Sequence, residues 1–362
     1  MPIVSVNLVV LNGERYVRYF LDSLEKQTYL HNKIELNVLD NGSTDKTKGI
    51  VRDFGFRISG LGFAKFNFVS SVSNLGMWLG QEELLKYSGG KYIITTAVDI
   101  ILDENFIKNA VEAMERDDKI GALQPKIYRF ELGNMNNESR GENHNSLSTI
   151  HYSRTIDTCG FKIFRSRRVV NIGHGEENKG QYDGLGEIFA VEGAAPVFRK
   201  EALESCRISQ PATEIVDHDL FWYGDDLDLA WRMRILGWKE IFAPDVIAWH
   251  DRQTTKTLKK TWSDYFKRVP VRRQIPIKKR RLDWRNTRWT FVKNDYIINI
   301  LKDLPWVVFR EIAVLGYAIL FEPGILKEIP VFFKYLPKML RKRKEIMKKA
   351  TVSPKEIRRW FN

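Results

Sequence analysis

Strand-length apolar runs alternate with helical patterns over the first 130 residues, and this alternation restricts the possible fold more than any other feature of the chain. The runs IVSVNLVVL (3–11) and IELNVLDNGSTD (34–45) flank a segment, 14–27, whose apolar residues recur at helical spacing. A strand, a helix and a strand joined by short links predict the start of a parallel βαβ sheet.

This alternation predicts an α/β fold in which helices flank an open, doubly wound sheet of nucleotide-binding type, and ordered patterns resume at 184–203 and 238–250. The elements that we expect are a strand and loop at 66–76, a helix at 77–88, a buried strand at 91–102, a helix at 104–117, a strand from 120, a strand, turn and helix start within 184–203, and a strand and turn at 238–250.

Residues 131–155 are polar, rich in Asn and without periodicity. This composition is typical of a loop, and we expect a mobile lid.

Charge divides the 362 residues into two parts. Residues 253–362 contain 28 Lys and Arg against 9 Asp and Glu, whereas the whole chain has a net charge of +13, so residues 1–252 are mildly acidic. We therefore predict an acidic working domain at 1–252 and a basic extension at 253–362 that meets an anionic partner, such as a membrane surface or a nucleic acid.

The extension contains aromatic-rich helical patterns broken by prolines (295–340), followed by a basic tail (341–362). Its longest uncharged run, IAVLGYAILF, has ten residues, whereas spanning a bilayer requires about 20. We therefore expect helices that lie on a membrane. The mixture of Arg and Lys with Trp and Tyr at 262–293 would also suit a nucleic acid, but the neighbouring aromatic helices favour an anionic bilayer surface.

The two cysteines, Cys159 and Cys206, are too few and too isolated for a disulfide framework or a zinc site. They indicate a reducing compartment.

Acidic residues stand where two predicted strands end, Asp40 in VLDNGSTD and Asp99 in TTAVDIIL. Ligands of α/β sheets bind at the carboxyl ends of strands, so this pair favours a site, although one such aspartate alone is equally compatible with an Asx-turn.

A cluster of three acids, Asp225, Asp226 and Asp228, opens a helical pattern in FWYGDDLDLAWRMRILGW (221–238). Like charges this close raise one another's pKa, which suits a general base, and we expect the pKa of Asp226 to be raised by the other two. Helix capping is the alternative, and we expect it for Asp228. Arg232 could pair with one of the acids or contact a phosphate.

An ordered set of motifs along residues 3–252 resembles that of family 2 glycosyltransferases with the GT-A fold, especially bacterial rhamnosyltransferase-like members. The motifs are, in order, VSVNLVVLNGERYVRYFLDSL, LDNGSTDKT, SNLGMWLG, the strand ending in Asp99, VEGAAPVFRKEAL, FWYGDDLDLAWRMRILGW and APDVIAWH. The strings DNGSTD and DDLDLAWR are the specific part of this resemblance.

The resemblance implies an inverting transfer of a sugar from a UDP- or dTDP-sugar to an acceptor hydroxyl, with a divalent Mg²⁺ or Mn²⁺ ion offsetting the charge of the diphosphate. It implies a glycan or lipid-linked acceptor, a role in bacterial surface polysaccharide synthesis, and a peripheral location on the cytoplasmic face of the membrane. The implied roles are catalytic for Asp226 and Asp225, donor-binding for Asn12, Asp40, Asn74 and Asp99, close approach of the backbone for Gly193 and Ala194, and metal coordination for Asp99 and His250.

The chain departs from the family pattern at two places. Ala97 stands where relatives have Asn or Asp, so the metal motif is AVD, and Val10-Leu11-Asn12 replaces a usual Thr-Tyr-Asn. A non-catalytic sugar-nucleotide-binding or scaffold protein of the same fold therefore stays open as an alternative. A nucleotidyltransferase is a second alternative, but it would need a basic, Gly-rich loop near the amino terminus, and VVLNGERY fits that poorly.

Overall fold

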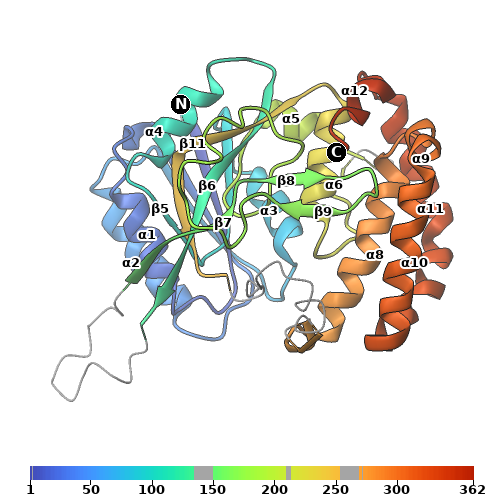
Figure 1. Ribbon diagram of the computed structural model, residues 1–362. Coiled ribbons are helices and arrows are strands. Elements are labelled where there is room, and N and C mark those ends of the chain that lie inside the picture. The colour runs from blue at the N-terminus through green and yellow to red at the C-terminus, as the bar shows by residue number, and fades with distance from the viewer. Residues whose placement is uncertain (2, 134–149, 209–212, 253–268, 271) are drawn as a thin grey trace.

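A computed structural model describes all residues except 2, 134–149, 209–212, 253–268 and 271 (Figure 1). Its centre is a mixed sheet in the order β3-β2-β1-β4-β10-β6-β11-β5, with β7 paired to β6. The strands are β1 (Val4–Val10), β2 (Ile34–Asp40), β3 (Lys65–Ser70), β4 (Tyr92–Thr96), β5 (Ile100–Leu102), β6 (Ile120–Leu132), β7 (Ile150–Thr158), β10 (Val197–Arg199) and β11 (Lys239–His250), and a small second sheet pairs β8 (Phe161–Ile163) with β9 (Val169–Asn171).

The predicted parallel βαβ start is confirmed. β1 pairs in parallel with both β2 and β4, and β2 pairs in parallel with β3. Val10 is opposite Asp40, which is opposite Ser70, so the carboxyl ends of these strands lie at one edge of the sheet. β1, β2 and β4 are buried along their whole length, as expected of a sheet covered on both faces.

Helices pack on the apolar faces of the sheet, which confirms the predicted fold class (Figure 1). They are α1 (Val17–Glu25), α2 (Thr47–Ser59), α3 (Met77–Leu85), α4 (Phe106–Met114), α5 (Lys200–Ser205) and α6 (Asp225–Ile235).

Three expectations about individual elements need correction. The helix α2 was not predicted, because KGIVRDFGFRIS contains two glycines that weaken a helical pattern. The run 91–102 is two strands, β4 and β5, and Asp99 lies between them. Only part of 131–155 can be assessed, since 134–149 lies outside the described residues; within the rest, β6 extends to Leu132 and β7 begins at Ile150, and the two pair antiparallel.

The basic extension is helical, as predicted, and stacks beside α6 on one side of the molecule (Figure 1). Its elements are α8 (Ile277–Asn294), α9 (Ile297–Lys302), α10 (Leu304–Phe321), the short 3₁₀ helix η3 (Pro323–Lys327), α11 (Glu328–Lys348) and α12 (Pro354–Arg358).

The last residues are packed against the first part of the chain, although we expected a basic tail. The ring of Phe361 lies 5.8 Å from that of Trp231 and 6.2 Å from that of Phe189, measured between centroids. Ile346 and Ile357 belong to the same buried cluster. The apolar residues between the basic ones, which the charge count conceals, therefore give the extension and residues 1–252 a common core.

One helix of the described part of the chain, α10, is long and apolar enough to cross a membrane by length and composition. The uncharged run that we measured in the sequence is shorter, because Arg310 and Glu311 interrupt the helix. Only 6% of this helix is buried within the structure.

Candidate active site

Loops at the carboxyl edge of the sheet hold three of the predicted donor-binding residues. Asn12, which has a positive φ of 48°, accepts a hydrogen bond from the backbone N–H of Thr44 (2.9 Å). Asn74 accepts one from the side chain of Asn41 (2.9 Å). These amides join the loops that follow β1, β2 and β3, so they shape this edge.

Asp40 is fully buried at the end of β2. One carboxylate oxygen accepts the backbone N–H of Ser43 (3.2 Å), and the other lies 3.4 Å from the ammonium of Lys48. This bond reaches three residues along the chain, not the two of the Asx-turn that we considered for Asp40, and it leaves the second oxygen facing a single lysine.

Asp99 and His250 meet although 150 residues separate them in the chain. β5 pairs antiparallel with the end of β11, which places Ile100 opposite His250. The Nε2 atom of His250 then lies 3.4 Å from a carboxylate oxygen of Asp99. Burial acts to raise the pKa of Asp99, but its contact with His250 outweighs burial and holds that pKa below its usual value.

Asp157, on β7, completes this arrangement and was missed in the sequence. Its buried carboxylate accepts a hydrogen bond from Nδ1 of His250 (2.9 Å) and from Nε of Arg252 (2.8 Å). Burial would raise the pKa of Asp157, but these two partners lower it to about 2. Burial alone would lower the pKa of His250, yet the two carboxylates raise it to about 9.

Arg252 extends the chain of charges to Glu192, another residue that we did not predict. Its guanidinium donates to the Glu192 carboxylate at 2.6 Å. Glu192 stands inside the quoted motif VEGAAPVFRKEAL, so it had a signal in the sequence. Asp157 lies in β7, a strand that we did not predict, and the partners of both residues come from distant parts of the chain.

Asp226 lies beyond Glu192 and opposite the predicted backbone loop. One oxygen of its half-buried carboxylate accepts the backbone N–H of Gly193 (3.3 Å), and the other accepts that of Leu227 (2.8 Å). A Cβ on Gly193 would lie 3.5 Å from the first oxygen, so glycine leaves this carboxylate open on that side. Ala194 is buried and donates its N–H to Glu192 (3.0 Å).

The pKa values of the two acids at the start of α6 are raised. Burial is the largest cause for Asp226, followed by the negative charges of Asp225 and Glu192, and together they raise its pKa to about 8. Burial also raises the pKa of Asp225, to about 6. We predicted that Asp225 and Asp228 raise the pKa of Asp226. Asp225 does so, but the second acid is Glu192 and not Asp228.

Among the described residues, no group of three or more His, Cys, Asp or Glu side chains is close enough to hold a metal ion. Asp99 and His250 form a pair of candidate ligands, and their ligand atoms are 3.4 Å apart. Hard oxygen ligands at about 2.1 Å from a small divalent ion fit such a spacing. Asp157 holds the other ring nitrogen of His250, which is the usual arrangement around a metal-bound histidine.

Comparison with known proteins agrees with these features. Residues 5–171 match glycosyl transferase family 2. This segment, a little under half of the chain, is therefore a glycosyl transferase family 2 domain. It is 30% identical over 122 residues to an uncharacterised glycosyltransferase of Haemophilus influenzae, and 30% identical over 117 residues to one of Rickettsia prowazekii. These matches cover 34% and 32% of this chain, and they span about a third of the length of the relatives, 36% and 33%.

Solved structures of similar fold cover the rest of the chain as well. TarS of S. aureus superimposes with a TM-score of 0.52 at 13% identity, covering 99% of this chain and 55% of TarS. The structure of GalNAc-T7 with UDP, GalNAc and Mn²⁺ superimposes with a TM-score of 0.50 at 14% identity. This match covers 83% of this chain and 57% of the GalNAc-T7 chain. The predicted GT-A fold is thereby confirmed.

Asp228 of this glycosyltransferase does not cap α6, contrary to our expectation, and makes ion pairs instead. Its buried carboxylate lies 3.0 Å from the guanidinium of Arg232 and 2.7 Å from the ammonium of Lys293 on α8. The two possibilities left open for Arg232 are thus resolved in favour of pairing with an acid. A side chain that caps a helix accepts hydrogen bonds from backbone N–H groups. The carboxylate of Asp228 instead pairs with two buried cations.

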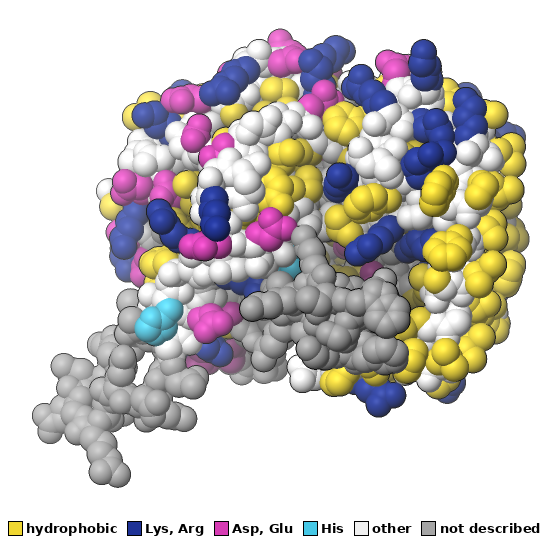
Figure 2. All heavy atoms as spheres, in the orientation of Figure 1, with side chains coloured by type: hydrophobic (Ala, Val, Ile, Leu, Met, Phe, Trp, Pro, Cys, Tyr) yellow, Lys and Arg dark blue, Asp and Glu magenta, His cyan; other side chains and the backbone are white. Residues whose placement is uncertain are grey.

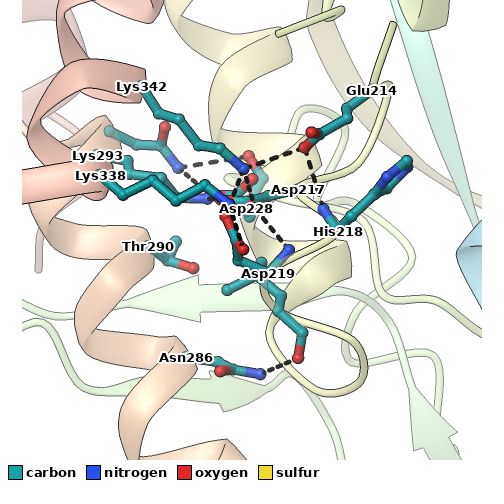
Figure 3. Close-up of polar contacts among 12 residues, drawn as sticks. Glu214, Asp217, His218, Asp219, Asp228, Asn286, Thr290, Lys293, Lys338 and Lys342 are labelled. Atoms are coloured by element: carbon teal, nitrogen blue, oxygen red, sulfur yellow. Dashed lines mark hydrogen bonds and ion pairs between the residues drawn. The ribbon is translucent and has the colours of Figure 1, made fainter. Parts of the chain in front are cut away.

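A second contact from α8 fixes the turn before the candidate base. The buried amide nitrogen of Asn286, which Figure 3 shows on α8, lies within hydrogen-bond distance of three backbone carbonyls, those of Leu220 (2.7 Å), Trp222 (2.8 Å) and Tyr223 (2.8 Å). Tyr223 and Gly224 both have positive φ, 68° and 75°. The extension therefore holds the strained turn from which Asp225 and Asp226 start.

Buried ion pairs lie farther along α8 from this contact (Figure 3). The ammonium of Lys293, with a fully buried side chain, contacts Asp217 as well as Asp228. Lys342, from α11, reaches Asp217, Asp219 (2.8 Å) and Glu214 (3.0 Å). Burial acts to raise the pKa of Asp217, but the two lysines outweigh it and hold that pKa well below its usual value.

We predict that Lys293→Met lowers the free energy of unfolding by about 3–5 kcal/mol, because it leaves two carboxylates buried with one cation fewer. Lys338→Met is the matched control. Its ammonium pairs with Asp219 in the same cluster, but its side chain is 43% exposed, so the expected loss is below about 1 kcal/mol. Urea unfolding followed by fluorescence measures both, and equal losses would contradict the prediction.

Proposed function

We propose that this protein is an inverting, metal-dependent glycosyltransferase that moves a sugar from a nucleotide-diphosphate donor to an acceptor hydroxyl. The donor is a UDP- or dTDP-sugar, with dTDP-rhamnose as one candidate, and the acceptor is a glycan, lipid-linked, in the synthesis of a bacterial surface polysaccharide. The observation that carries this proposal is the position of Asp226, an open carboxylate with a raised pKa at the start of a helix, next to Gly193.

Asp226 acts as the general base. As the acceptor oxygen attacks the anomeric carbon, its proton passes to the Asp226 carboxylate, and the bond from that carbon to the diphosphate oxygen breaks. A single displacement of this kind inverts the anomeric centre. A raised pKa makes the carboxylate a stronger base, which favours proton transfer from a hydroxyl. Asp225 takes no proton in this step and orients the acceptor beside Asp226.

Asp99 and His250 would hold Mg²⁺ or Mn²⁺, and Asp157 would orient the His250 ring. When bound, such an ion offsets the negative charge that develops on the diphosphate leaving group. The structure of GalNAc-T7, which has a similar fold, contains UDP and Mn²⁺. His250 must release its Nε2 proton to serve as a ligand, since a protonated ring nitrogen has no lone pair to offer.

Asn12, Asp40 and Asn74 would line the nucleotide pocket at the carboxyl edge of β1, β2 and β3. Asp40 would reach the donor base with the oxygen that faces Lys48 rather than with the one bound to Ser43. Solved structures of similar fold include TarS 1–349 in complex with UDP-GlcNAc, with a TM-score of 0.52.

We predict that Asp226→Asn lowers turnover about 10²–10⁴-fold, the usual contribution of general base catalysis, without unfolding the protein. Asp118→Asn removes the charge of an aspartate whose side chain is 92% exposed, and it should leave turnover unchanged. Release of the nucleoside diphosphate, measured with and without acceptor, gives the rates. Full activity of Asp226→Asn would refute the assigned base.

We predict that turnover rises with pH and levels off above about 8, because Asp226 accepts a proton only in its ionised form. Glu192→Gln removes a negative charge that raises the pKa of Asp226, so the rise should move to lower pH. Glu112→Gln, at an exposed position of α4, should leave the profile where it is. A profile of Glu192→Gln that stays in place or moves to higher pH would contradict this role.

A non-catalytic sugar-nucleotide-binding protein is the second candidate, and it is favoured by the AVD motif, in which Ala97 supplies no ligand. The two candidates differ in how binding depends on metal. We predict that calorimetry finds tighter binding of UDP or dTDP with Mn²⁺ than with EDTA, that Asp99→Asn removes this difference, and that Asp103→Asn keeps it. Metal-independent binding without turnover would favour the second candidate.

A further inference from the structure

The outward face of α10 is apolar, and its side chains are exposed. Phe309, Ile312, Ile319 and Leu320 have exposed fractions of 74%, 65%, 55% and 73%. Their spacing places them on one side of the helix. Figure 2 shows hydrophobic side chains gathered along the edge of the molecule where Figure 1 places α10.

The charged residues of the same helix face inward. Glu311 pairs with Arg288 of α8 at 2.6 Å and with Arg310 at 2.6 Å, and the Arg310 side chain is only 20% exposed. A surface helix of a protein in water has the opposite arrangement, with its apolar stripe toward the core. The inverted arrangement indicates that the outer surroundings of α10 are not water alone.

The apolar surface continues onto α9, which contacts α10. Its exposed members include a tryptophan near the start of α10, a residue that favours the level of lipid headgroups. They are Ile297 (61%), Ile298 (46%), Leu301 (58%), Leu304 (44%) and Trp306 (53%).

Exposed cations accompany this apolar surface. Lys302, the last residue of α9, lies where α9 meets α10, and Lys327, the last residue of η3, lies beyond the other end of α10. Within η3, Gly324 lies close to Ile277 at the start of α8, where Lys278 is exposed. Cations that border an apolar band complement the anionic headgroups that border the acyl chains of a bilayer.

We propose that this surface, formed by α9 and α10, docks onto the face of an anionic lipid bilayer with α10 parallel to the membrane. The helix has 18 residues and is about 27 Å long. Its inner side is fastened to α8 by ion pairs, so only its outer side can enter the acyl region. This geometry corresponds to a helix that lies in the interface, not to one that spans the bilayer. The surface is separate from the residues assigned to glycosyl transfer.

Co-sedimentation of the full chain with lipid vesicles tests this proposal. We expect binding to vesicles of phosphatidylcholine mixed with phosphatidylglycerol, weaker binding to phosphatidylcholine alone, and partial release at about 1 M sodium chloride, where charges are screened within about 3 Å. Replacing Phe309, Ile312 and Leu320 together with Ser should weaken binding at least about a thousandfold, given the free energy of burying three large apolar side chains.

The matched control replaces three exposed apolar residues of the first part of the chain, Leu30, Phe56 and Val72, with Ser. It should bind vesicles like the wild type, and both variants should keep the wild-type rate of donor hydrolysis, which distinguishes a failure of docking from a failure of the proposed reaction. Equal binding by both triple variants would overturn the proposal. So would resistance of the bound protein to alkaline carbonate, which indicates a spanning helix, or a stable dimer that forms through this face and does not bind vesicles.

Discussion

The ion pairs of Lys293 with Asp217 and Asp228 hold the rest of the structure in place. All three side chains are fully buried, and moving such charges out of water costs several kcal/mol for each ion unless each one is paired. The cluster is therefore stable only when α8, α6 and the 214–219 segment are assembled together. Since Asn286 on the same helix holds the turn before Asp225, the geometry of the candidate base depends on residues more than 60 positions away in the chain.

The acids of the site divide into two groups according to their neighbours. Asp99 and Asp157 face His250 and Arg252, and their pKa values are lowered despite burial. In the part of the chain that the structure describes, no such cation offsets burial at Asp225 and Asp226, so burial raises their pKa values. Acids of the first group stay ionised over the physiological range, as a metal ligand must, whereas Asp226 can exchange a proton near neutral pH. Opposite environments for carboxylates in one site are the usual basis for separate roles.

Patterns within short segments were enough to predict much of this protein, and pairings between distant segments were not. The apolar runs predicted the parallel strands, and the resemblance to family 2 members indicated Asp99 and His250, which the antiparallel pairing of β5 with β11 brings together. Periodicity could not reveal that Asp157 on β7 and Arg252 would face His250, because no local pattern encodes a contact across about 95 residues. Asp228 was misjudged for the same reason: its position suggested a cap, and its partner Lys293 lies in the extension.

The extension has two surfaces with opposite physical character, and α8 connects them. Toward the first part of the chain, α8 presents Asn286 and Lys293 to buried polar partners, and toward α10 it presents Arg288 to Glu311. If the outer face of α10 rests on a bilayer, the rigid helix between the two contacts sets a fixed distance from the lipid surface to the turn that carries Asp226.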